Sequence, residues 1–429
     1  MDGKMEGAGP SRNRHLKRLL DCSERASNAF THGLHPYPAK MVPQIASYLT
    51  NRYSEPGDII LDPFCGSGTT LVEALLNQRN AIGCDINPFA VLLSRVKTTP
   101  IDPADLLSVW QILKRSLSTS TAISRAGATA LRESSFLNLG FWYKPYVIRD
   151  LGYICDLTNS TLADKDSRIL DFFRLMIART ARQVSNQRPG EFKRWRISQT
   201  EMALYRPKPI DSFIENVENA LPKMESYFNS LKKGYKSRVL LKDVRNLKLR
   251  KKVSLILTSP PYGDSGTTVA YGEFSSFGSE WIGLADKDTR RLDRYPFGNI
   301  VGSKVDPTQS RSLARTYDAV RKVSLNRATY MGQFFDGMSS ALQVMRNTLE
   351  SDGVCCLIIG NRRIRGIEIP TARIIEELAC QVGFRLEYRH IRRVSNKVMP
   401  YATKPWNASG KDATQPTINS ESILVLHSN

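Results

Sequence analysis

Residues 58–70 read DIILDPFCGSGTT, a short apolar run followed at once by a glycine-rich turn. The run predicts a strand at Asp58–Leu61, and the residues after the turn predict a helix at Thr69–Leu76. Gly66 and Gly68 allow a sharp turn close to a ligand, and the free N–H groups of a helix start favour a carboxylate or a phosphate. The spacing is neither the dinucleotide fingerprint nor the phosphate-loop pattern, so an ordinary tight strand–helix connection also fits.

Strand and helix patterns alternate on both sides of this stretch. Because strand–helix–strand units at this spacing form parallel strands with right-handed crossovers, the chain predicts an α/β fold. Further helices are expected at Pro43–Tyr53, Pro88–Val96 and Thr371–Val382. Further strands are expected at Asn80–Asp85, Arg238–Leu241, Val253–Leu257, Gly353–Ile359, Phe384–Val394 and Ser422–His427.

Two long segments interrupt the alternation. Residues 263–333 are polar and rich in glycine and arginine, which predicts a long loop that covers a site or binds a partner. Residues 101–235 are aromatic and mixed in charge, and they indicate an inserted helical block with helices at Pro103–Leu117, Lys144–Leu157, Ser167–Arg182 and Pro209–Leu231.

The charge balance points to a polyanion partner. The 429 residues include 61 Lys and Arg against 41 Asp and Glu, a formal net charge of +20. A well-solvated basic surface is the alternative, and charge alone does not choose between DNA and RNA. The basic residues cluster in 10–25, 232–252, 287–327 and 362–397.

Other classes of protein are disfavoured. No segment approaches the roughly 18 consecutive apolar residues of a membrane span, and the polar start lacks the core of a secretory signal. We therefore expect a soluble, cytoplasmic protein. The seven cysteines form no CxxC pair and the five histidines are scattered, so we expect no metal site and buried, reduced cysteines.

Carboxylates follow two further strands. Asp85 ends the second strand, where an acidic residue of a doubly wound fold takes the ribose hydroxyls of a nucleoside cofactor. Alternatively, Asp85 caps the helix that begins near Pro88. Asp243 follows Val239–Lys242 and is placed to bind an adenine amine, although an ion pair within its basic run is equally consistent.

A stiff corner, Thr258-Ser259-Pro260-Pro261-Tyr262, ends the apolar run 253–257. The Ser259 hydroxyl and the Pro260 carbonyl are two hydrogen-bond acceptors, and Pro261 fixes the backbone beside them. A planar base with an exocyclic amine can donate both N–H bonds there and stack on Tyr262. The alternative is a proline-terminated loop after a core strand.

Together these stretches resemble the S-adenosylmethionine-dependent DNA amino-methyltransferases. LDPFCGSGTT (61–70) is similar to their motif I, GCDINP (83–88) to their acidic motif II loop, and TSPPY (258–262) to their catalytic motif IV. HPYPAKMVP (35–43) resembles the segment that folds over the methionine part of the cofactor. The resemblance implies a Rossmann-like class I methyltransferase with a mostly parallel seven-stranded sheet and a large, mainly helical insertion.

The resemblance also implies the residues that bind S-adenosylmethionine. Asp62 and Gly66 would line its methionine part, and Asp85 would bind its ribose. The full implied set is His35, Pro36, Tyr37, Pro38, Lys40, Asp62, Pro63, Phe64, Cys65, Gly66, Ser67, Gly68, Thr69, Thr70, Asp85, Ile86, Asn87, Asp243 and Thr258.

The implied catalytic residues are Ser259, Pro260, Pro261 and Tyr262. Ser259 and the Pro260 carbonyl would accept the amine hydrogens of a base flipped out of duplex DNA. In this family Asp at the first motif position usually accompanies adenine N6 methylation and Ser usually accompanies cytosine N4, so we expect cytosine N4, with adenine N6 as the alternative. Cytosine C5 methylation is disfavoured, because it needs a cysteine after a proline and none is present.

The expected division of the chain follows from these matches: a basic arm at 1–30, a cofactor-binding half at 31–100, the helical insertion at 101–235, and a catalytic half at 236–429 that carries the loop 263–333. Arg, Asn and Gln read base edges, so target recognition is expected in one of the two interruptions. The candidate segments are Arg182–Arg188 with Lys193–Arg196, and Tyr271–Phe274 with Arg290–Arg291.

Two rival functions stay open. Some tRNA guanine-N2 methyltransferases share a similar loop and a PPYG corner, and Gly263 follows Tyr262 here. Those enzymes usually carry Asp in place of Ser259 and an N-terminal RNA-binding domain for which 1–30 leaves no room. A silent DNA-binding subunit typically loses the glycine loop or the corner, and both are present. The resemblance implies a prokaryotic restriction-modification setting, with a cognate endonuclease encoded elsewhere, and leaves the oligomeric state open.

Overall fold

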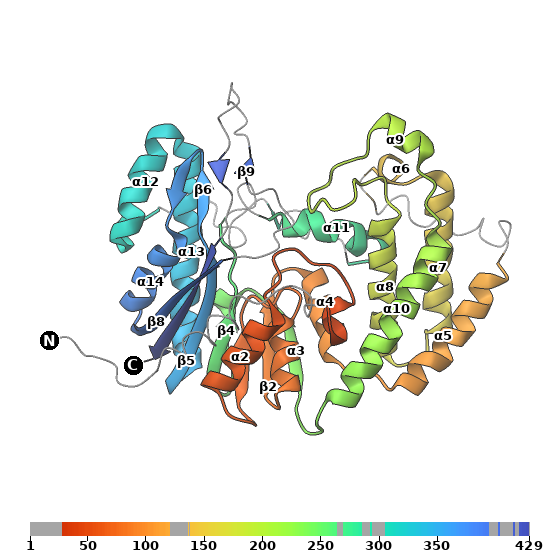
Figure 1. Ribbon diagram of the computed structural model, residues 1–429, viewed down its shortest axis with the longest axis horizontal. Coiled ribbons are helices and arrows are strands. Elements are labelled where there is room, and N and C mark those ends of the chain that lie inside the picture. The colour runs from red at the N-terminus through yellow and green to blue at the C-terminus, as the bar shows by residue number, and fades with distance from the viewer. Residues whose placement is uncertain are drawn as a thin grey trace.

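The computed structural model describes residues 28–120, 136, 138–263, 269–284, 292–293, 305–393, 402–403, 415–416 and 420–428. A central sheet lies between a small group of helices from the last third of the chain and a larger helical lobe (Figure 1).

The central sheet has the strand order β3-β2-β1-β4-β5-β11-β8. The pairs from β3 to β5 are parallel, whereas β11 is antiparallel to β5 and β8. The expected Rossmann-like α/β fold with a mostly parallel seven-stranded sheet is therefore confirmed. The strands span Ile59–Asp62 (β1), Asn80–Asp85 (β2), Ser237–Leu241 (β3), Val253–Thr258 (β4), Leu349–Gly360 (β5), Phe384–Arg393 (β8) and Ser420–Ser428 (β11).

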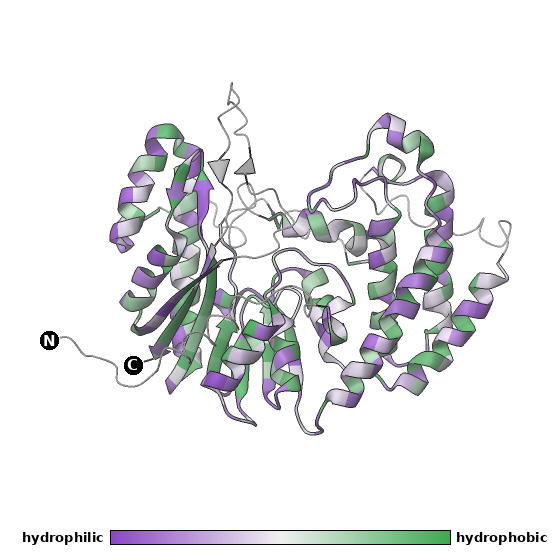
Figure 2. Ribbon diagram, in the orientation of Figure 1, coloured by the Kyte–Doolittle hydropathy of each residue, from purple (hydrophilic) through white to green (hydrophobic). Residues whose placement is uncertain are grey.

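Alternate strand residues enter two different cores, because successive side chains of a strand point to opposite faces. Ile60 packs among residues of α2 (Pro43–Tyr53) and α3 (Thr69–Leu76), and Leu61 packs among residues of α13 (Leu325–Thr348) and α14 (Thr371–Gln381). Burial of each such side chain stabilises the fold by about 1.5–3 kcal/mol. Figure 2 shows the corresponding hydrophobic colouring of the sheet.

The helical lobe packs around aromatic side chains such as Trp110, Phe173 and Phe213. Its core continues into α4 (Pro88–Thr98) through Phe89, so the lobe and the α/β part share buried surface. The lobe consists of α5 (Pro103–Ser118), α6 (Leu139–Trp142), α7 (Pro145–Thr161), α8 (Ser167–Gln183), α9 (Gln199–Leu204) and α10 (Pro209–Ser230).

The expectation of a loop across 263–333 is wrong for its described parts. Residues Tyr271–Trp281 form α11, Pro307–Gln309 form a 3-10 turn (η7), and Arg311–Val323 form α12. α13 begins at Leu325 and was also missed. Small and polar residues dilute the apolar pattern in the sequence, but the aromatic residues of α11 enter the core of the helical lobe.

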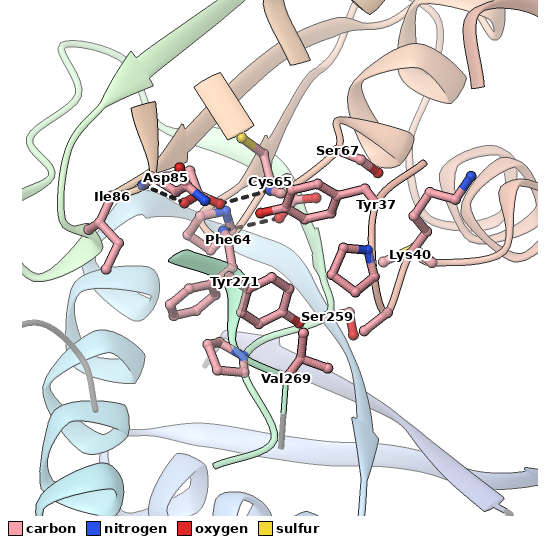
Figure 3. Close-up of a pocket in the computed structure, with 18 of the residues that line it drawn as sticks. Tyr37, Lys40, Phe64, Cys65, Ser67, Asp85, Ile86, Ser259, Val269 and Tyr271 are labelled. Atoms are coloured by element: carbon pink, nitrogen blue, oxygen red, sulfur yellow. Dashed lines mark hydrogen bonds between the residues drawn. The ribbon is translucent and has the colours of Figure 1, made fainter. Parts of the chain in front are cut away.

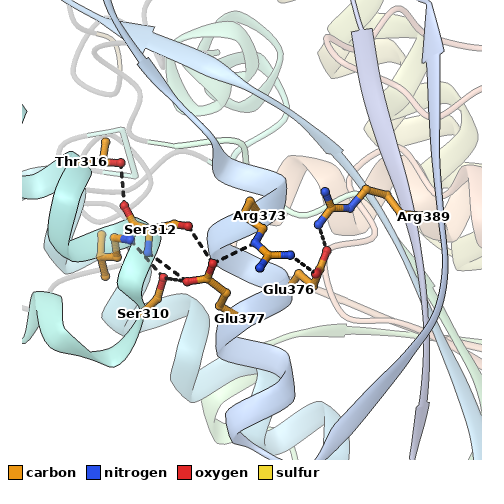
Figure 4. Close-up of polar contacts among 8 residues, drawn as sticks. Ser310, Ser312, Thr316, Arg373, Glu376, Glu377 and Arg389 are labelled. Carbon is orange, nitrogen blue, oxygen red and sulfur yellow. Dashed lines mark hydrogen bonds and ion pairs between the residues drawn. The ribbon is translucent and has the colours of Figure 1, made fainter. Parts of the chain in front are cut away.

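A carboxylate of α14 holds the start of α12 (Figure 4). Glu377 Oε2 accepts hydrogen bonds from Ser310 Oγ (2.6 Å) and Ser312 N (3.0 Å), and Oε1 accepts from Ser312 Oγ (2.7 Å) and Arg373 Nε (2.9 Å). Burial opposes ionisation, but these hydrogen bonds outweigh it and lower the pKa of Glu377 to about 2. The neighbouring Glu376 pairs with Arg373 and Arg389.

Short elements complete the described chain: the 3-10 turns Phe30–Gly33 (η2) and Val244–Asn246 (η5), the antiparallel pair Arg362–Ile364 (β6) and Ile367–Ile369 (β7), and the pair Ala402–Thr403 (β9) and Gln415–Pro416 (β10). None of the helices in the described ranges is both long and apolar enough to cross a membrane.

Candidate functional site

A cavity of about 160 Å3 opens where β1, β2 and β4 end, since parallel strands bring their carboxyl ends to one edge of the sheet. Figure 3 shows Asp85 and Ser259 on opposite sides of two tyrosine rings that project into it. Most predicted site residues line this cavity: Tyr37, Pro38, Lys40, Asp62, Pro63, Phe64, Cys65, Gly66, Ser67, Thr69, Thr70, Asp85, Ile86, Asn87, Asp243, Ser259 and Pro261.

The glycine-rich turn is built for close packing. Gly66 and Gly68 have φ values of 47° and 78°, which favour glycine. A Cβ on Gly68 would lie 2.8 Å from Ser94 Oγ, and that same hydroxyl donates to the Gly66 carbonyl oxygen over 2.8 Å. The turn therefore presses α3 against α4 and leaves the backbone of Gly66 on the cavity wall.

Asp85 ties this turn to the next one. Its Oδ2 accepts from Gly66 N (2.9 Å) and its Oδ1 accepts from Asn87 N (2.8 Å). The cap of α4 is Asn87, whose Oδ1 accepts from Phe89 N (3.0 Å), so the capping role considered for Asp85 belongs to Asn87. Burial raises the pKa of Asp85 to about 6, although the backbone hydrogen bonds partly offset it.

Asp62 is the second buried carboxyl group of the cavity. Its Oδ1 accepts from Thr258 Oγ1 (2.6 Å) and Phe64 N (3.1 Å), which joins the ends of β1 and β4. Burial raises the pKa of Asp62 to about 6 against these hydrogen bonds, and the charge of Asp85 raises it further. Four aspartates line the cavity against two lysines, Lys40 and Lys242, so ionised carboxyl groups give it a net negative charge, which suits a cationic ligand.

Asp243 has partners of its own. Its Oδ1 accepts from Arg245 N (2.9 Å), and its Oδ2 lies 2.6 Å from a guanidinium nitrogen of Arg245. The ion pair considered from the sequence is therefore present, and Asp243 still lines the cavity.

Six predicted residues do not line the cavity: His35, Pro36, Gly68, Thr258, Pro260 and Tyr262. His35 is buried between Phe89 and Phe274, with Nδ1 2.5 Å from the Pro36 carbonyl oxygen, and burial lowers its pKa to about 3. It is a neutral packing residue. Thr258 acts on the cavity only through Asp62.

The corner after β4 has an internal hydrogen-bond network. Ser259 Oγ lies 3.0 Å from the Tyr262 hydroxyl and donates to the Ile358 carbonyl oxygen over 3.1 Å. The Tyr262 hydroxyl donates to Glu421 Oε1 (3.2 Å). Gly263 packs directly against the Arg362 guanidinium, and a Cβ there would overlap it.

Beyond Gly263, four cavity residues from the 263–333 segment were not expected in the cofactor site: Val269, Tyr271, Leu292 and Asp293. Tyr271 stacks on Tyr37, while Leu292 and Asp293 complete the wall. Asp293 accepts from Gly272 N (2.9 Å) and Glu273 N (2.5 Å), so it fixes the first turn of α11. Tyr271 had been placed within a recognition candidate; an aromatic residue at a helix start was the only local signal, and Asp293 gave none.

The candidate recognition residues at 182–196 divide into structural and exposed ones. Residues 186–197 form a hairpin. Gln187 and Arg196 pair as an antiparallel β-bridge, and the backbone N–H of Arg188 donates to the Trp195 carbonyl oxygen over 2.7 Å. Ser185, Asn186 and Gln187 are buried and use their side chains to hold the loop. Arg188, Lys193, Trp195 and Arg196 are exposed. Arg290 and Arg291 lie outside the described residues.

The hairpin rests on α11. Arg194 donates from its backbone N to Glu273 Oε1 (2.8 Å) and from Nε to Ser276 Oγ (2.7 Å), and its guanidinium lies 4.4 Å from the Phe277 ring centroid. Arg182 covers the Phe274 ring at 4.1 Å. Both arginines use their side chains to hold this part of the lobe against α11.

Within the described ranges, no three His, Cys, Asp or Glu side chains are grouped as metal ligands. Cys65, Cys84, Cys155, Cys355 and Cys356 are buried free thiols, and Cys380 is exposed.

Comparison with known proteins identifies relatives. A family model described as DNA methylase matches residues 8–95. The chain is 31% identical over 416 residues to the Type II methyltransferase M.MvaI of Kocuria varians, covering 92% of this chain and 90% of that protein.

Two shorter matches come from Methanocaldococcus jannaschii. The Type II methyltransferase M.MjaII is 46% identical over 80 residues, 19% of this chain and 15% of that protein. A tRNA (guanine(10)-N2)-dimethyltransferase is 49% identical over 53 residues, 12% of this chain and 15% of that protein. The tRNA enzyme thus shares one short segment with this chain, whereas M.MvaI aligns along nearly its whole length.

Proposed function

The chain belongs to the DNA amino-methyltransferase family, and we propose that it methylates the exocyclic N4 amine of a cytosine flipped out of duplex DNA, with S-adenosylmethionine as donor. The observation that carries the proposal is the position of Ser259, an uncharged hydrogen-bond acceptor, on the same cavity as Asp62 and Asp85. We place the reaction in a restriction-modification system, with adenine N6 as the alternative amine.

The chemistry of the residues that line the cavity suits the methyl donor. S-adenosylmethionine carries a cationic sulfonium and an ammonium group, which complement the buried carboxyl groups of Asp62 and Asp85. In this proposal Asp85 receives the ribose hydroxyls and Asp62 faces the methionine part. The turn at Gly66 brings bare backbone to the wall, and Tyr37 with Tyr271 offers an aromatic face.

The chemistry supplied by the donor needs no protein nucleophile: the amine lone pair bonds to the methyl carbon, the carbon–sulfur electron pair returns to sulfur, and the amine loses one proton to water. The residues of the corner align the amine. In this proposal Ser259 Oγ accepts one amine hydrogen at the cavity wall, and the carbonyl of the adjoining Pro260, which does not itself line the cavity, accepts the other, so that the lone pair is directed away from both. A serine rather than an aspartate at this position favours cytosine N4.

We assign target recognition to the 186–197 hairpin. It rests on α11, whose first residue lines the cavity, and it exposes Arg188, Lys193, Trp195 and Arg196. Arginine and lysine can hold phosphates, and an arginine or an exposed aromatic ring can contact bases. In this scheme residues 31–100 and 236–429 are the cofactor-binding and catalytic halves around the inserted lobe.

Transfer of labelled methyl groups from S-adenosylmethionine tests the function. Duplex DNA should be labelled, bulk tRNA should not, and sequencing for modified bases should find N4-methylcytosine at one site. Ser259→Ala should lower the rate by about a hundredfold or more while binding the donor normally, because the contacts that it removes are to the amine, Tyr262 and Ile358 and none is to the donor. Ser254→Ala, on the same strand, should be unaffected.

Each rival predicts a different result. Label only in tRNA would indicate the guanine-N2 reaction, and N6-methyladenine would indicate the alternative DNA base. A protein that binds DNA but shows no heat of S-adenosylmethionine binding in calorimetry would be a silent subunit. Full activity of Ser259→Ala would contradict the assigned mechanism.

A further inference from the structure

A line of hydrogen bonds runs from the catalytic corner across the sheet to its antiparallel edge. Ser259 Oγ lies 3.0 Å from the Tyr262 hydroxyl, which donates to Glu421 Oε1 over 3.2 Å. Glu421 Oε2 in turn accepts from Arg392 Nε at 2.9 Å, and a second guanidinium nitrogen lies 2.9 Å away. Glu421 is on β11 and is paired in register with Gly360 of β5 and Arg392 of β8.

The two ends of this line are anchored. The Arg392 and Glu421 side chains are 5% and 17% exposed, so the ion pair is mostly shielded from water. At the other end, Ser259 Oγ donates to the carbonyl oxygen of Ile358, which is on β5. Three strands (β5, β8 and β11) and the corner after β4 thus hold the atoms that decide where the Ser259 hydroxyl proton points.

The available protons determine which hydroxyl group donates each hydrogen bond of this line. A carboxylate and a backbone carbonyl can only accept, so Glu421 and Ile358 each take a hydrogen bond and give none. The charged acceptor binds the stronger bond, which commits the Tyr262 proton to Glu421. The Ser259 proton is then used by Ile358 O or by the Tyr262 oxygen. In both cases the Ser259 hydroxyl proton points away from the cavity. The lone pairs of Ser259 Oγ then face the cavity as acceptors.

We propose that Glu421 is a positioning residue for methyl transfer, which acts through Tyr262 to keep Ser259 Oγ an acceptor for the substrate amine. The inference rests on the proposed function. An amine whose hydrogen is accepted keeps its lone pair for the methyl group, whereas a hydroxyl that donates to the amine nitrogen would occupy that lone pair. The ion pair with Arg392 holds the Glu421 carboxylate in place.

Two substitutions break the line at different points. In Glu421→Gln the amide can donate to the Tyr262 oxygen, so Tyr262 can turn its proton toward Ser259 and fill a lone pair there. Tyr262→Phe keeps the aromatic ring and leaves the ion pair untouched, but it leaves the Ile358 carbonyl as the one neighbour of this line that holds the Ser259 proton, so that proton is freer to turn into the cavity. Glu387→Gln is the matched control, because Glu387 pairs with His427 (2.7 Å) between the same two strands at their other end.

The test is a double-mutant cycle on the single-turnover rate of methyl transfer to duplex DNA. Glu421→Gln and Tyr262→Phe should each lower the rate by about tenfold to a hundredfold, and the double variant should be no slower than the slower single variant. The melting temperature, the Kd for S-adenosylmethionine and the Kd for DNA should match wild type. Glu387→Gln should keep the wild-type rate.

Several outcomes would overturn the inference. They are a wild-type rate for Tyr262→Phe, a wild-type rate for folded Glu421→Gln, and multiplying losses in the double variant, which would mean that Glu421 acts independently of the tyrosine hydroxyl. Should Glu421→Gln fold poorly, Tyr262→Phe alone decides. A wild-type protein that labels no DNA refutes the proposed function instead, so the two failures are distinguishable.

Discussion

Tyr37 and Tyr271 stack in the cavity with ring centroids 5.8 Å apart and an interplanar angle of 25°. Tyr37 precedes α2 in the first part of the chain, and Tyr271 begins α11 in the second. Phe274, one turn further along α11, meets the edge of Tyr37 at 5.7 Å. The aromatic wall of the cavity is thus shared by two distant segments, and neither tyrosine supplies it alone.

Removal of Tyr271 should therefore weaken donor binding. Tyr271→Ala leaves Tyr37 without its stacking partner and opens the wall, so we expect the Kd for S-adenosylmethionine to rise about tenfold in calorimetry. Tyr271→Phe keeps the ring and should bind nearly normally. Tyr330→Ala, an exposed tyrosine of α13, serves as the control. Equal affinity of Tyr271→Ala and wild type would remove Tyr271 from the binding site.

Asp85→Ala should weaken donor binding more than Tyr271→Ala does. It removes the proposed ribose contact, and it also leaves the backbone N–H groups of Gly66 and Asn87 without their carboxylate acceptor. We expect donor binding to weaken by about a hundredfold or more. Asp58→Ala is the control, because Asp58 directly precedes β1, at the opposite end of the strand pair β1–β2 from Asp85. A variant that loses DNA binding but keeps donor binding would contradict the assignment.

Donor binding should depend on pH. The pKa values of Asp62 and Asp85 are both about 6 in the ligand-free protein, so these groups become neutral as the pH falls below that value. Since the cationic donor prefers the ionised forms, we expect its affinity at about pH 5 to be roughly tenfold lower than at about pH 7.5. Calorimetry across this range measures it, and a flat profile would argue against charged carboxylates in the site.

The same raised pKa values have the opposite effect on stability of the ligand-free protein. A carboxyl group whose folded pKa lies above its unfolded value contributes stability that is present at low pH and is lost as the pH rises through about 6. The two pH trends, for donor affinity and for stability, should therefore run in opposite directions.

The hairpin assignment predicts a specific loss of DNA binding. Arg188→Ala should weaken binding to duplex DNA and lower the slope of log Kd against log salt by about one, as expected for one lost phosphate contact. Trp195→Ala should alter the preference for the target sequence. Arg115→Ala, on the exposed face of α5 in the same lobe, is the charge-matched control. If Arg115→Ala and Arg188→Ala weaken binding equally, the effect is net charge rather than a contact.

Glu377→Gln should destabilise the protein in a pH-dependent way. The folded pKa of Glu377 is about 2, below its usual 4.5, so its stabilisation is complete above about pH 4.5 and is lost as the pH falls towards 2. We expect a loss of about 2 kcal/mol in the free energy of unfolding at neutral pH, shrinking on acidification. Denaturant titrations measure it. Glu368→Gln, in an exposed ion pair with Arg363, should cost less than about 1 kcal/mol.

Local signals predicted the elements around the glycine turn. α3 begins directly after Gly68 and α4 begins at Pro88 after the cap Asn87, and both starts could be recognised from neighbouring residues. Asp62, Asp85 and Ser259 could be placed together because parallel strands end at one edge. The positions of these residues follow from strand, turn and helix-start patterns that are each recognisable within a few neighbouring residues.

Other parts of the site depend on contacts that the sequence does not display. Glu421 comes to Tyr262 only because β11 inserts between β5 and β8, and nothing near residue 421 marks it. α13 was missed because its buried residues are distributed around the helix and small residues separate them, so no single apolar stripe appears. The motif places His35 among the binding residues, whereas in the fold its ring packs against Phe89 and Phe274 and does not line the cavity.

The position of α11 has a consequence for the order of events. Its aromatic residues are fixed in the lobe, while its first residue forms part of the cavity wall, so any displacement of the lobe by a bound duplex is also a displacement of Tyr271. Thermodynamic linkage then requires reciprocity. If bound duplex changes the affinity for the donor by some factor, bound donor changes the affinity for the duplex by the same factor. A measured change in donor affinity on adding duplex would therefore fix the size of the change in duplex affinity on adding donor.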